Sequence, residues 1–209
     1  MQRFDEHNFQ HLCNELAGKD KRLQGILDEH GYPPMWTRPN HFETLVLTIL
    51  EQQVSLAAAY AAYKKLKEKI SIMPENILTL TDEELRSCYF TRQKTGYVRG
   101  LAKAVLSKEI VLKEFEEWDN DKIRAKLKSL KGIGDWTVDI YLIHVLQRTD
   151  LFPLGDLALV NAVRMLVNDK NLAKNKISLI AEDWKPYRTI ATMMLWHLYI
   201  KKRNIKILH

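Results

Sequence analysis

The sequence predicts an all-α protein, and three observations lead to this class. Apolar residues recur at helical spacing along most of the chain, as Phe42, Leu45, Val46 and Ile49 illustrate. No alternating apolar–polar run with turn signals indicates a sheet. No Gly-, Ser- or Pro-rich linker interrupts the 209 residues. We therefore expect one helical domain over residues 1–209, large enough for a sizeable core.

The apolar pattern also allows two lobes within this domain. Residues 40–110 and residues 120–170 each have an apolar pattern that could form a compact group of helices, and no internal repeat relates the two stretches. We expect residues 39–109 to form one lobe. Residues 110–169, together with 1–38 and 170–209, would form the other.

Composition and charge favour a soluble protein with a polyanionic partner. Lys and Arg exceed Asp and Glu by six (32 − 26), and the pI is about 9.2. The N-terminus lacks the apolar core of a signal peptide, and no stretch approaches the roughly 18 apolar residues that cross a bilayer. We expect no membrane association and a cytoplasmic location, or a nuclear one if the source is eukaryotic.

The metal-ligand types are scattered, so we expect no transition-metal site and no cofactor. Cys13 and Cys88 form no CxxC pair, which excludes the usual zinc and iron–sulfur patterns and favours two buried thiols. His144 and His197 lie in apolar helices without a second ligand at metal spacing, and we interpret both as hydrogen-bonded helix residues.

Caps and breaks divide the first half of the chain into helices. Two apolar stripes precede Gly31, and the prolines between 33 and 39 require a loop, because proline disfavours helix in the residue before it. Asn40 with Glu43 three residues later predicts a capped helix. Further helices are predicted after Ser55, after Thr81, and from Thr91 to about Lys108.

The second half contains the stretch around which we expect the chain to be organised, 130–160. A helix capped by Asp119 or Asn120 leads to the turn Gly132-Ile133-Gly134, and a helix over 136–147 follows. After a break at Phe152-Pro153, Asp156 opens another helix, which runs through Val167. Helices over 177–184 and 186–200 complete the chain. In the helix that Asp119 or Asn120 caps, the basic side chains are expected to face largely outward: Lys122, Arg124, Lys126 and Lys128.

The Gly-Ile-Gly turn is a candidate phosphate-binding element. A helix, a Gly-x-Gly turn and a second helix can present consecutive backbone N–H groups to phosphate, without base specificity. Glycine suits such a turn because it tolerates positive φ and leaves room beside a DNA backbone. Helix-capping glycines are the structural alternative. The context Leu-x-Gly-Ile-Gly-x-Trp-Thr, with a basic helix before it, favours the DNA-binding interpretation.

Residues 130–160 resemble the helix-hairpin-helix DNA glycosylase superfamily, and the similarity is closest to its 3-methyladenine DNA glycosylase II branch, which excises alkylated bases. Three further segments agree in order: 49–55 (ILEQQVS), 152–156 (FPLGD) and 184–188 (WKPYR). The resemblance extends over roughly residues 38–202. It implies the helix-hairpin-helix glycosylase fold, with an active-site cleft between two helical lobes.

The resemblance implies that Asp156 is the catalytic acid residue. Loss of a base builds oxocarbenium character on the sugar, and a nearby carboxylate can stabilise this charge and position or deprotonate the attacking water. The structural alternative, an N-cap for the following helix, is compatible with catalysis.

The resemblance also predicts a monofunctional enzyme. Members that cleave the strand carry a lysine in the hairpin helix, which attacks the sugar as an amine. Here Trp136 occupies the matching position, while Lys131 lies before the turn. We therefore expect water to be the nucleophile and an intact abasic site to be the product.

Aromatic residues are predicted to line the base pocket, because electron-rich rings attract a cationic alkylated purine. Trp136 and, by resemblance, Trp196 are the predicted walls, and Tyr141, Tyr187 and Trp36 are weaker candidates. Core packing is the alternative for each of them.

Base extrusion leaves a gap that a wedge must fill, and the resemblance assigns this role to Gln53. We interpret Gln52 as structural, capping the turn before Ser55, and Arg188 as a salt-bridge partner. The predicted DNA contacts of the hairpin are Lys131, Gly132, Ile133, Gly134 and Thr137. Carbonyls near Leu130 and Ile133 are a possible site for a monovalent cation.

The sequence thus predicts a monomeric DNA glycosylase that acts on alkylated purines in double-stranded DNA. Larger relatives carry a separate β-rich N-terminal domain, which we do not expect in the roughly 39 residues before the first matching helix. Two alternatives remain open: a non-catalytic DNA damage-binding protein, and a glycosylase for uracil, hypoxanthine or an oxidised purine.

Overall fold

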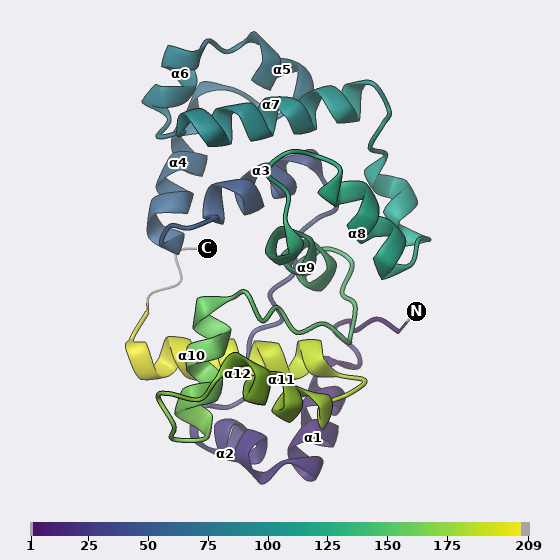
Figure 1. Ribbon diagram of the computed structural model, residues 1–209, viewed down its shortest axis with the longest axis vertical. Coiled ribbons are helices and arrows are strands. Elements are labelled where there is room, and N and C mark those ends of the chain that lie inside the picture. The colour runs from purple at the N-terminus through teal and green to yellow at the C-terminus, as the bar shows by residue number, and fades with distance from the viewer. Residues whose placement is uncertain (1, 206–209) are drawn as a thin grey trace. The chain divides into compact units, whose positions relative to one another are not determined.

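The computed structural model describes residues 2–205 and is helical, as predicted (Figure 1). Twelve α-helices and one 3-10 helix are present in this range. The only extended pairing among the described residues is an isolated bridge between Arg3 and Arg148. None of the helices between residues 2 and 205 has the length and apolar character needed to cross a membrane.

The chain forms two compact units by its internal contacts. Of the described residues, 2–37 and 142–205 form the first unit, and Arg38–Tyr141 form the second. The boundary falls within one helix, α9 (Asp135–His144). The predicted lobe division, which set 110–169 together with both ends of the chain, stays a prediction.

The first unit is built around its last helix, α12 (Arg188–Arg203). This helix is buried on all sides from Thr189 to Leu198, as expected for a helix that is apolar around its circumference. It packs against α1 (Phe9–Lys19), α2 (Lys21–His30) and α10 (Leu157–Leu166). The short α11 (Lys174–Glu182) packs on α10.

The second unit is built around α3 (Phe42–Glu51), in which nine of the ten residues are buried. It packs against α4 (Leu56–Lys69) and α7 (Arg92–Leu106). The helices α5 (Pro74–Thr79) and α6 (Asp82–Ser87) pack on α7 (Figure 1). The 3-10 helix Leu112–Glu116 leads to α8 (Asn120–Lys128) and then to α9.

Several predicted caps are confirmed, and one is wrong. Ser55, Thr81 and Asp119 each accept a backbone N–H of the first helical turn. Thr91, for which no cap was predicted, does the same. Asn40 does not cap α3. Its amide instead donates to the carbonyl of Leu112 at 3.0 Å and accepts the hydroxyl of Tyr141 at 2.7 Å, so tertiary partners outcompete the local capping box.

Candidate functional site

The hairpin predicted at Gly132-Ile133-Gly134 joins α8 to α9 in the second unit. Gly132 has a φ of +91°, and a Cβ placed there would lie 2.2 Å from Cγ of Tyr97. Gly134 has no heavy atom within 4 Å of such a Cβ. Glycine is therefore required at 132 by the backbone and by the Tyr97 ring, whereas the space beside 134 is open and would admit a Cβ.

The predicted DNA-contacting residues of the hairpin differ in exposure. Lys131 and Gly134 are exposed, while the side chains of Ile133 and Thr137 are buried. A buried side chain contributes to DNA binding through the backbone or through packing. Lys131 and the exposed backbone at Gly134 are thus the parts of the turn that are open to a phosphate.

Gln52 connects this hairpin to the turn between α3 and α4. Its Nε2 donates to the carbonyl of Gly132 at 2.9 Å and to Oγ1 of Thr137 at 2.9 Å. The predicted structural role of Gln52 is confirmed, but its Nε2 binds the hairpin 80 residues further along the chain and not the turn before Ser55.

Gln53, the predicted wedge, lies in that same turn and is held outward. It is exposed and adopts a φ of +58°, which is unusual for a residue with a Cβ. The end of α3 beside it is well anchored: Lys94 Nζ donates to the carbonyl of Leu50 at 2.6 Å, and Arg38 forms a bidentate pair with the buried Glu51. A fixed backbone therefore presents the Gln53 side chain to solvent.

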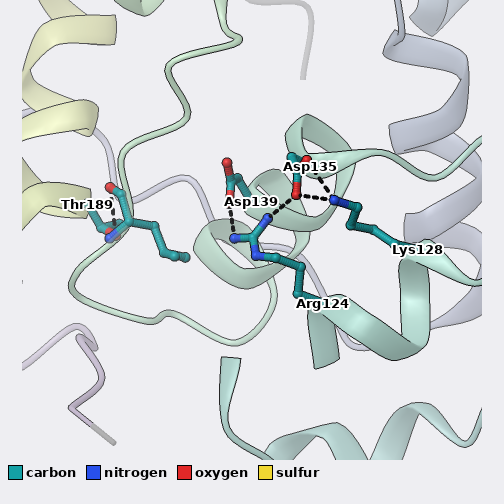
Figure 2. A network of polar contacts seen from close by, with 6 residues as sticks. Arg124, Lys128, Asp135, Asp139 and Thr189 are labelled. Atoms are coloured by element: carbon teal, nitrogen blue, oxygen red, sulfur yellow. Dashed lines mark hydrogen bonds and ion pairs between the residues drawn. The ribbon is translucent and has the colours of Figure 1, made fainter. Parts of the chain in front are cut away.

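A cluster of charges fixes α8 against α9 (Figure 2). The Arg124 guanidinium donates to Asp135 at 3.0 Å and to Asp139 at 2.5 Å, and Lys128 pairs with Asp135 at 2.8 Å. The expectation that these side chains face outward is confirmed for Lys128, which is exposed even though it pairs with Asp135. Arg124 is partly buried, because Asp135 and Asp139 of the next helix bind its guanidinium. Burial raises the pKa of Asp139, and the Arg124 charge opposes that rise.

Trp136 lies on α9 between the two aspartates of this cluster and is half-buried. The charge cluster therefore fixes the helix turn that carries Trp136 as well as the hairpin. Tyr141, a weaker pocket candidate on the same helix, is 1% exposed. Its hydroxyl is bound to Asn40 and its ring meets Phe115 edge to face, so it belongs to the core of the second unit.

Asp156 occupies the N-cap position of α10 in the first unit, as predicted. Its Oδ1 accepts the backbone N–H of Leu159 at 2.8 Å and the indole Nε1–H of Trp196 at 3.2 Å. The residue is half-buried, and Leu157 next to it is 72% exposed. A carboxylate is thus held in a fixed direction near the protein surface.

The remaining aromatic candidates of the first unit have different surroundings. Trp196 is 9% exposed and stacks on His144. Trp36 is half-buried, and its carbonyl accepts a hydrogen bond from His144. Tyr187 precedes α12 and is half-buried, with the Lys19 ammonium 5.7 Å from its ring centroid.

Other residues take the structural roles that the sequence predicted. Arg188 pairs with Asp150 at 2.7 Å and with Glu182 at 3.1 Å. Both cysteines are free and buried, and burial raises the pKa of Cys13 to about 12. Between residues 2 and 205 no group of three or more His, Cys, Asp or Glu side chains is arranged to hold a metal ion. The cation site at Leu130 and Ile133 stays a prediction.

Comparison with known proteins agrees with this geometry. Residues 46–186, which contain the α3–α4 turn, the hairpin and Asp156, match the family described as HhH-GPD superfamily base excision DNA repair protein. The chain belongs to the HhH-GPD superfamily.

Similar proteins from this superfamily cover most of the chain. The DNA-3-methyladenine glycosylase 1 of Schizosaccharomyces pombe is 30% identical over 87% of this chain and 83% of its own length. The solved structure of the 3-methyladenine DNA glycosylase of S. pombe in complex with abasic DNA matches with a TM-score of 0.83 and 29% identity, over 89% of this chain and 95% of that one. A DNA-3-methyladenine glycosidase from Bacillus halodurans gives a TM-score of 0.75 and 27% identity, over 98% and 95%.

In this HhH-GPD protein the structure also identifies residues that sequence reasoning missed or undervalued. Gln52 joins the α3–α4 turn to the hairpin, Arg124 joins α8 to α9, and His144 joins Trp36 to Trp196. The partners lie 11 to 108 residues apart in these contacts. No local spacing in the sequence reveals pairs of that kind.

Proposed function

We propose that this protein is a monofunctional DNA glycosylase that removes alkylated purines, of the 3-methyladenine type, from double-stranded DNA. The observation that carries the proposal is Asp156, whose carboxylate is held by Leu159 and Trp196 at the N-terminus of α10. The names of the relatives support the substrate class. The protein would act as a monomer on DNA with one extruded base, in the cytoplasm or, in a eukaryote, in the nucleus.

The proposed reaction is hydrolysis of the N-glycosidic bond. The bond breaks with its electron pair leaving on the base, and positive charge develops on the sugar. The negative charge of Asp156 stabilises this oxocarbenium character, and the carboxylate accepts a proton from the water that attacks the anomeric carbon. A carboxylate that is already oriented before the base departs requires little reorganisation at this step.

The remaining roles follow from the residue types and their exposure. Trp136 stands where strand-cleaving relatives have lysine, so no amine is available there for a covalent intermediate. Gln53 would fill the gap left by the extruded base. Lys131 and the backbone at Gly134 would bind phosphate, with Trp136 and Trp196 contributing to base recognition.

The test compares wild type with Asp156→Asn on a duplex carrying one alkylated adenine, with a uracil duplex as the substrate control. Alkali then cleaves at any abasic site. We expect wild type to give strand cleavage only after alkali, and Asp156→Asn to be slower by on the order of 100-fold or more. The amide oxygen of asparagine keeps the cap of α10, so the variant should retain its stability.

The chain offers a matched control in the same unit. Asp20 caps α2 through Arg22 N–H and also accepts a tryptophan indole N–H, from Trp184 at 2.9 Å. Asp20 differs from Asp156 in its ion pair with Arg22, but Asp20→Asn changes the same chemical group at another helix N-cap, so it should leave excision unchanged. Tight DNA binding with no excision by wild type on either duplex would refute the glycosylase and support a damage-binding protein. Excision of uracil alone would refute the proposed substrate class.

A further inference from the structure

We infer that His144 is a positioning residue for Asp156, acting through the indole of Trp196. His144 ends α9 and is 8% exposed. The inference rests on the proposed function, since it concerns the orientation of the carboxylate that would perform the reaction.

The plane of the His144 ring is fixed by a hydrogen bond to the backbone. Its Nδ1 lies 2.7 Å from the carbonyl oxygen of Trp36. Because a carbonyl only accepts, Nδ1 carries the proton and donates it. A buried ring with this bond has little freedom to rotate about its side-chain torsions, so it presents a face of fixed direction.

Trp196 stacks on that face. The two ring centroids are 5.4 Å apart and the planes differ by 12°. Offset stacking at this separation is a favourable geometry for aromatic pairs, and tilting of the indole would break the contact. His144 therefore determines the plane in which the indole N–H of Trp196 lies.

The direction of this N–H decides how Asp156 is held. The bond from Nε1 to Oδ1 of Asp156 is 3.2 Å, at the long end of the range for N–H···O hydrogen bonds. A small rotation of the indole would weaken it steeply. The second donor to the same oxygen, Leu159 N–H, belongs to α10, whereas Trp196 belongs to α12. Donors from two helices thus hold the carboxylate, and His144 controls the donor on α12.

His197 provides a matched control for the effect of losing a buried histidine. It follows Trp196 on α12, is 6% exposed, and donates from Nε2 to the carbonyl of His30 at 3.1 Å. Its ring contacts are with His30 and Trp36. It thus resembles His144 in burial and in its bond to a backbone carbonyl, but it does not stack on Trp196.

The kinetic test measures the single-turnover excision rate and, separately, the Kd for a duplex with an abasic site. His144→Leu removes the stacking ring and should lower the rate about tenfold, with the Kd changed less than about twofold, because one hydrogen bond to a charged group is weakened and no DNA contact is removed. His144→Phe keeps a ring and should recover most of the rate. His197→Leu should stay within about twofold of wild type. In a Trp196→Phe background, His144→Leu should have no further effect.

A spectroscopic readout tests the same contact without activity. The indole N–H resonance of Trp196 is assigned by its loss in Trp196→Phe, and its shift in Asp156→Asn reports the hydrogen bond. We expect His144→Leu to move this resonance and His197→Leu to leave it in place. If His144→Leu does not fold, His144→Gln and His197→Gln replace the two leucine variants, because glutamine removes the ring and keeps an N–H donor for the backbone carbonyl. The Trp196 resonance should then move in the first variant alone.

Each outcome decides between the claims. An unchanged resonance, or equal rate losses in the His144 and His197 variants, would overturn the positioning role. A resonance that moves as expected in a protein without excision activity would refute the glycosylase and leave the positioning relationship intact.

Discussion

Nε2 of Gln52 lies 2.9 Å from the carbonyl oxygen of Gly132, and this hydrogen bond joins the turn that presents Gln53 to the hairpin that presents Lys131. The same amide donates to Thr137 in the first turn of α9. Two segments to which we assign DNA contacts are therefore held by one side chain. Displacement of either segment would stretch the hydrogen bonds of this amide and so shift the other segment.

We predict that Gln52→Leu lowers both stability and DNA affinity. The substitution removes two hydrogen bonds, one of them to the buried Thr137, and should reduce the free energy of unfolding by about 1–3 kcal/mol. The hairpin would lose its fixed position relative to the α3–α4 turn, so the Kd for an abasic-site duplex should rise. Urea denaturation and fluorescence anisotropy measure the two effects.

The neighbouring residue gives the contrast. Gln53 is exposed and has φ +58°, and this positive φ is about as unfavourable for alanine as for glutamine, because both have a Cβ. Gln53→Ala should thus change stability by less than about 0.5 kcal/mol and lower the excision rate. If Gln52→Leu left stability and affinity at wild-type values, the coupling through its amide would be wrong.

The two glycines of the hairpin should respond differently to alanine. At Gly132 a Cβ would lie 2.2 Å from the Tyr97 ring and the φ of +91° disfavours any side chain, so Gly132→Ala should cost about 2–5 kcal/mol. At Gly134 a Cβ meets nothing within 4 Å, so Gly134→Ala should cost less than about 1 kcal/mol. Thermal denaturation of both variants measures the difference.

DNA binding separates the two positions further. If the exposed backbone at Gly134 approaches a phosphate, Gly134→Ala should weaken DNA binding while stability is retained. Replacing Tyr97 with leucine in the Gly132→Ala protein should recover part of its stability, because the clashing ring is removed. Equal melting temperatures for the two alanine variants would show that the Tyr97 contact does not require glycine.

The sequence predicted those features that depend on neighbours along the chain. The all-α class followed from helical periodicity, and the caps at Ser55, Thr81 and Asp156 followed from a capping residue type placed directly before a helical apolar pattern. Asp156 and the hairpin also fall within the matched family segment. Local spacing carries this information because helix caps and turns use local hydrogen bonds.

The sequence did not predict the hydrogen-bond partners that lie far away along the chain. Gln52 was assigned to its own turn, yet its partner is 80 residues away. Asn40 looked like a cap, yet Tyr141, 101 residues later, binds it. A polar side chain has several possible partners, and tertiary packing decides among them. The glycine at 132 shows the same limit, because the ring that excludes a Cβ belongs to Tyr97 on α7.

The pair between Arg124 and Asp139 should make stability depend on pH in a predictable direction. Burial raises the pKa of Asp139, so this carboxyl keeps its proton to a higher pH in the folded state than in the unfolded state. In the unfolded chain the pKa of an Asp side chain is about 3.9. Asp139 therefore contributes most to the free energy of unfolding when the pH is below its unfolded-state pKa. This contribution declines as the pH rises through the pKa of Asp139 in the folded state. Arg124 limits the decline, since its charge stabilises the carboxylate.

Arg124→Met should enlarge this pH dependence. Without the guanidinium the buried carboxylate has lost its cation, and the pKa of Asp139 should rise further. We expect the variant to be less stable than wild type by about 1–3 kcal/mol at pH 7, a value reduced from that of fully buried pairs because Arg124 is partly exposed. At a lower pH, such as pH 4, a larger fraction of Asp139 is protonated, and the difference should shrink. Urea denaturation at the two pH values measures it.

A second substitution separates the charge effect from lost packing. Asp139→Asn in the Arg124→Met protein removes the uncompensated charge, so it should recover much of the stability at pH 7 and abolish the difference between the two pH values. Asp135 would serve poorly for this purpose, because its side chain is 62% exposed. If Arg124→Met were equally destabilising at both pH values, and Asp139→Asn gave no recovery, the guanidinium would hold α8 against α9 by packing and not by its charge.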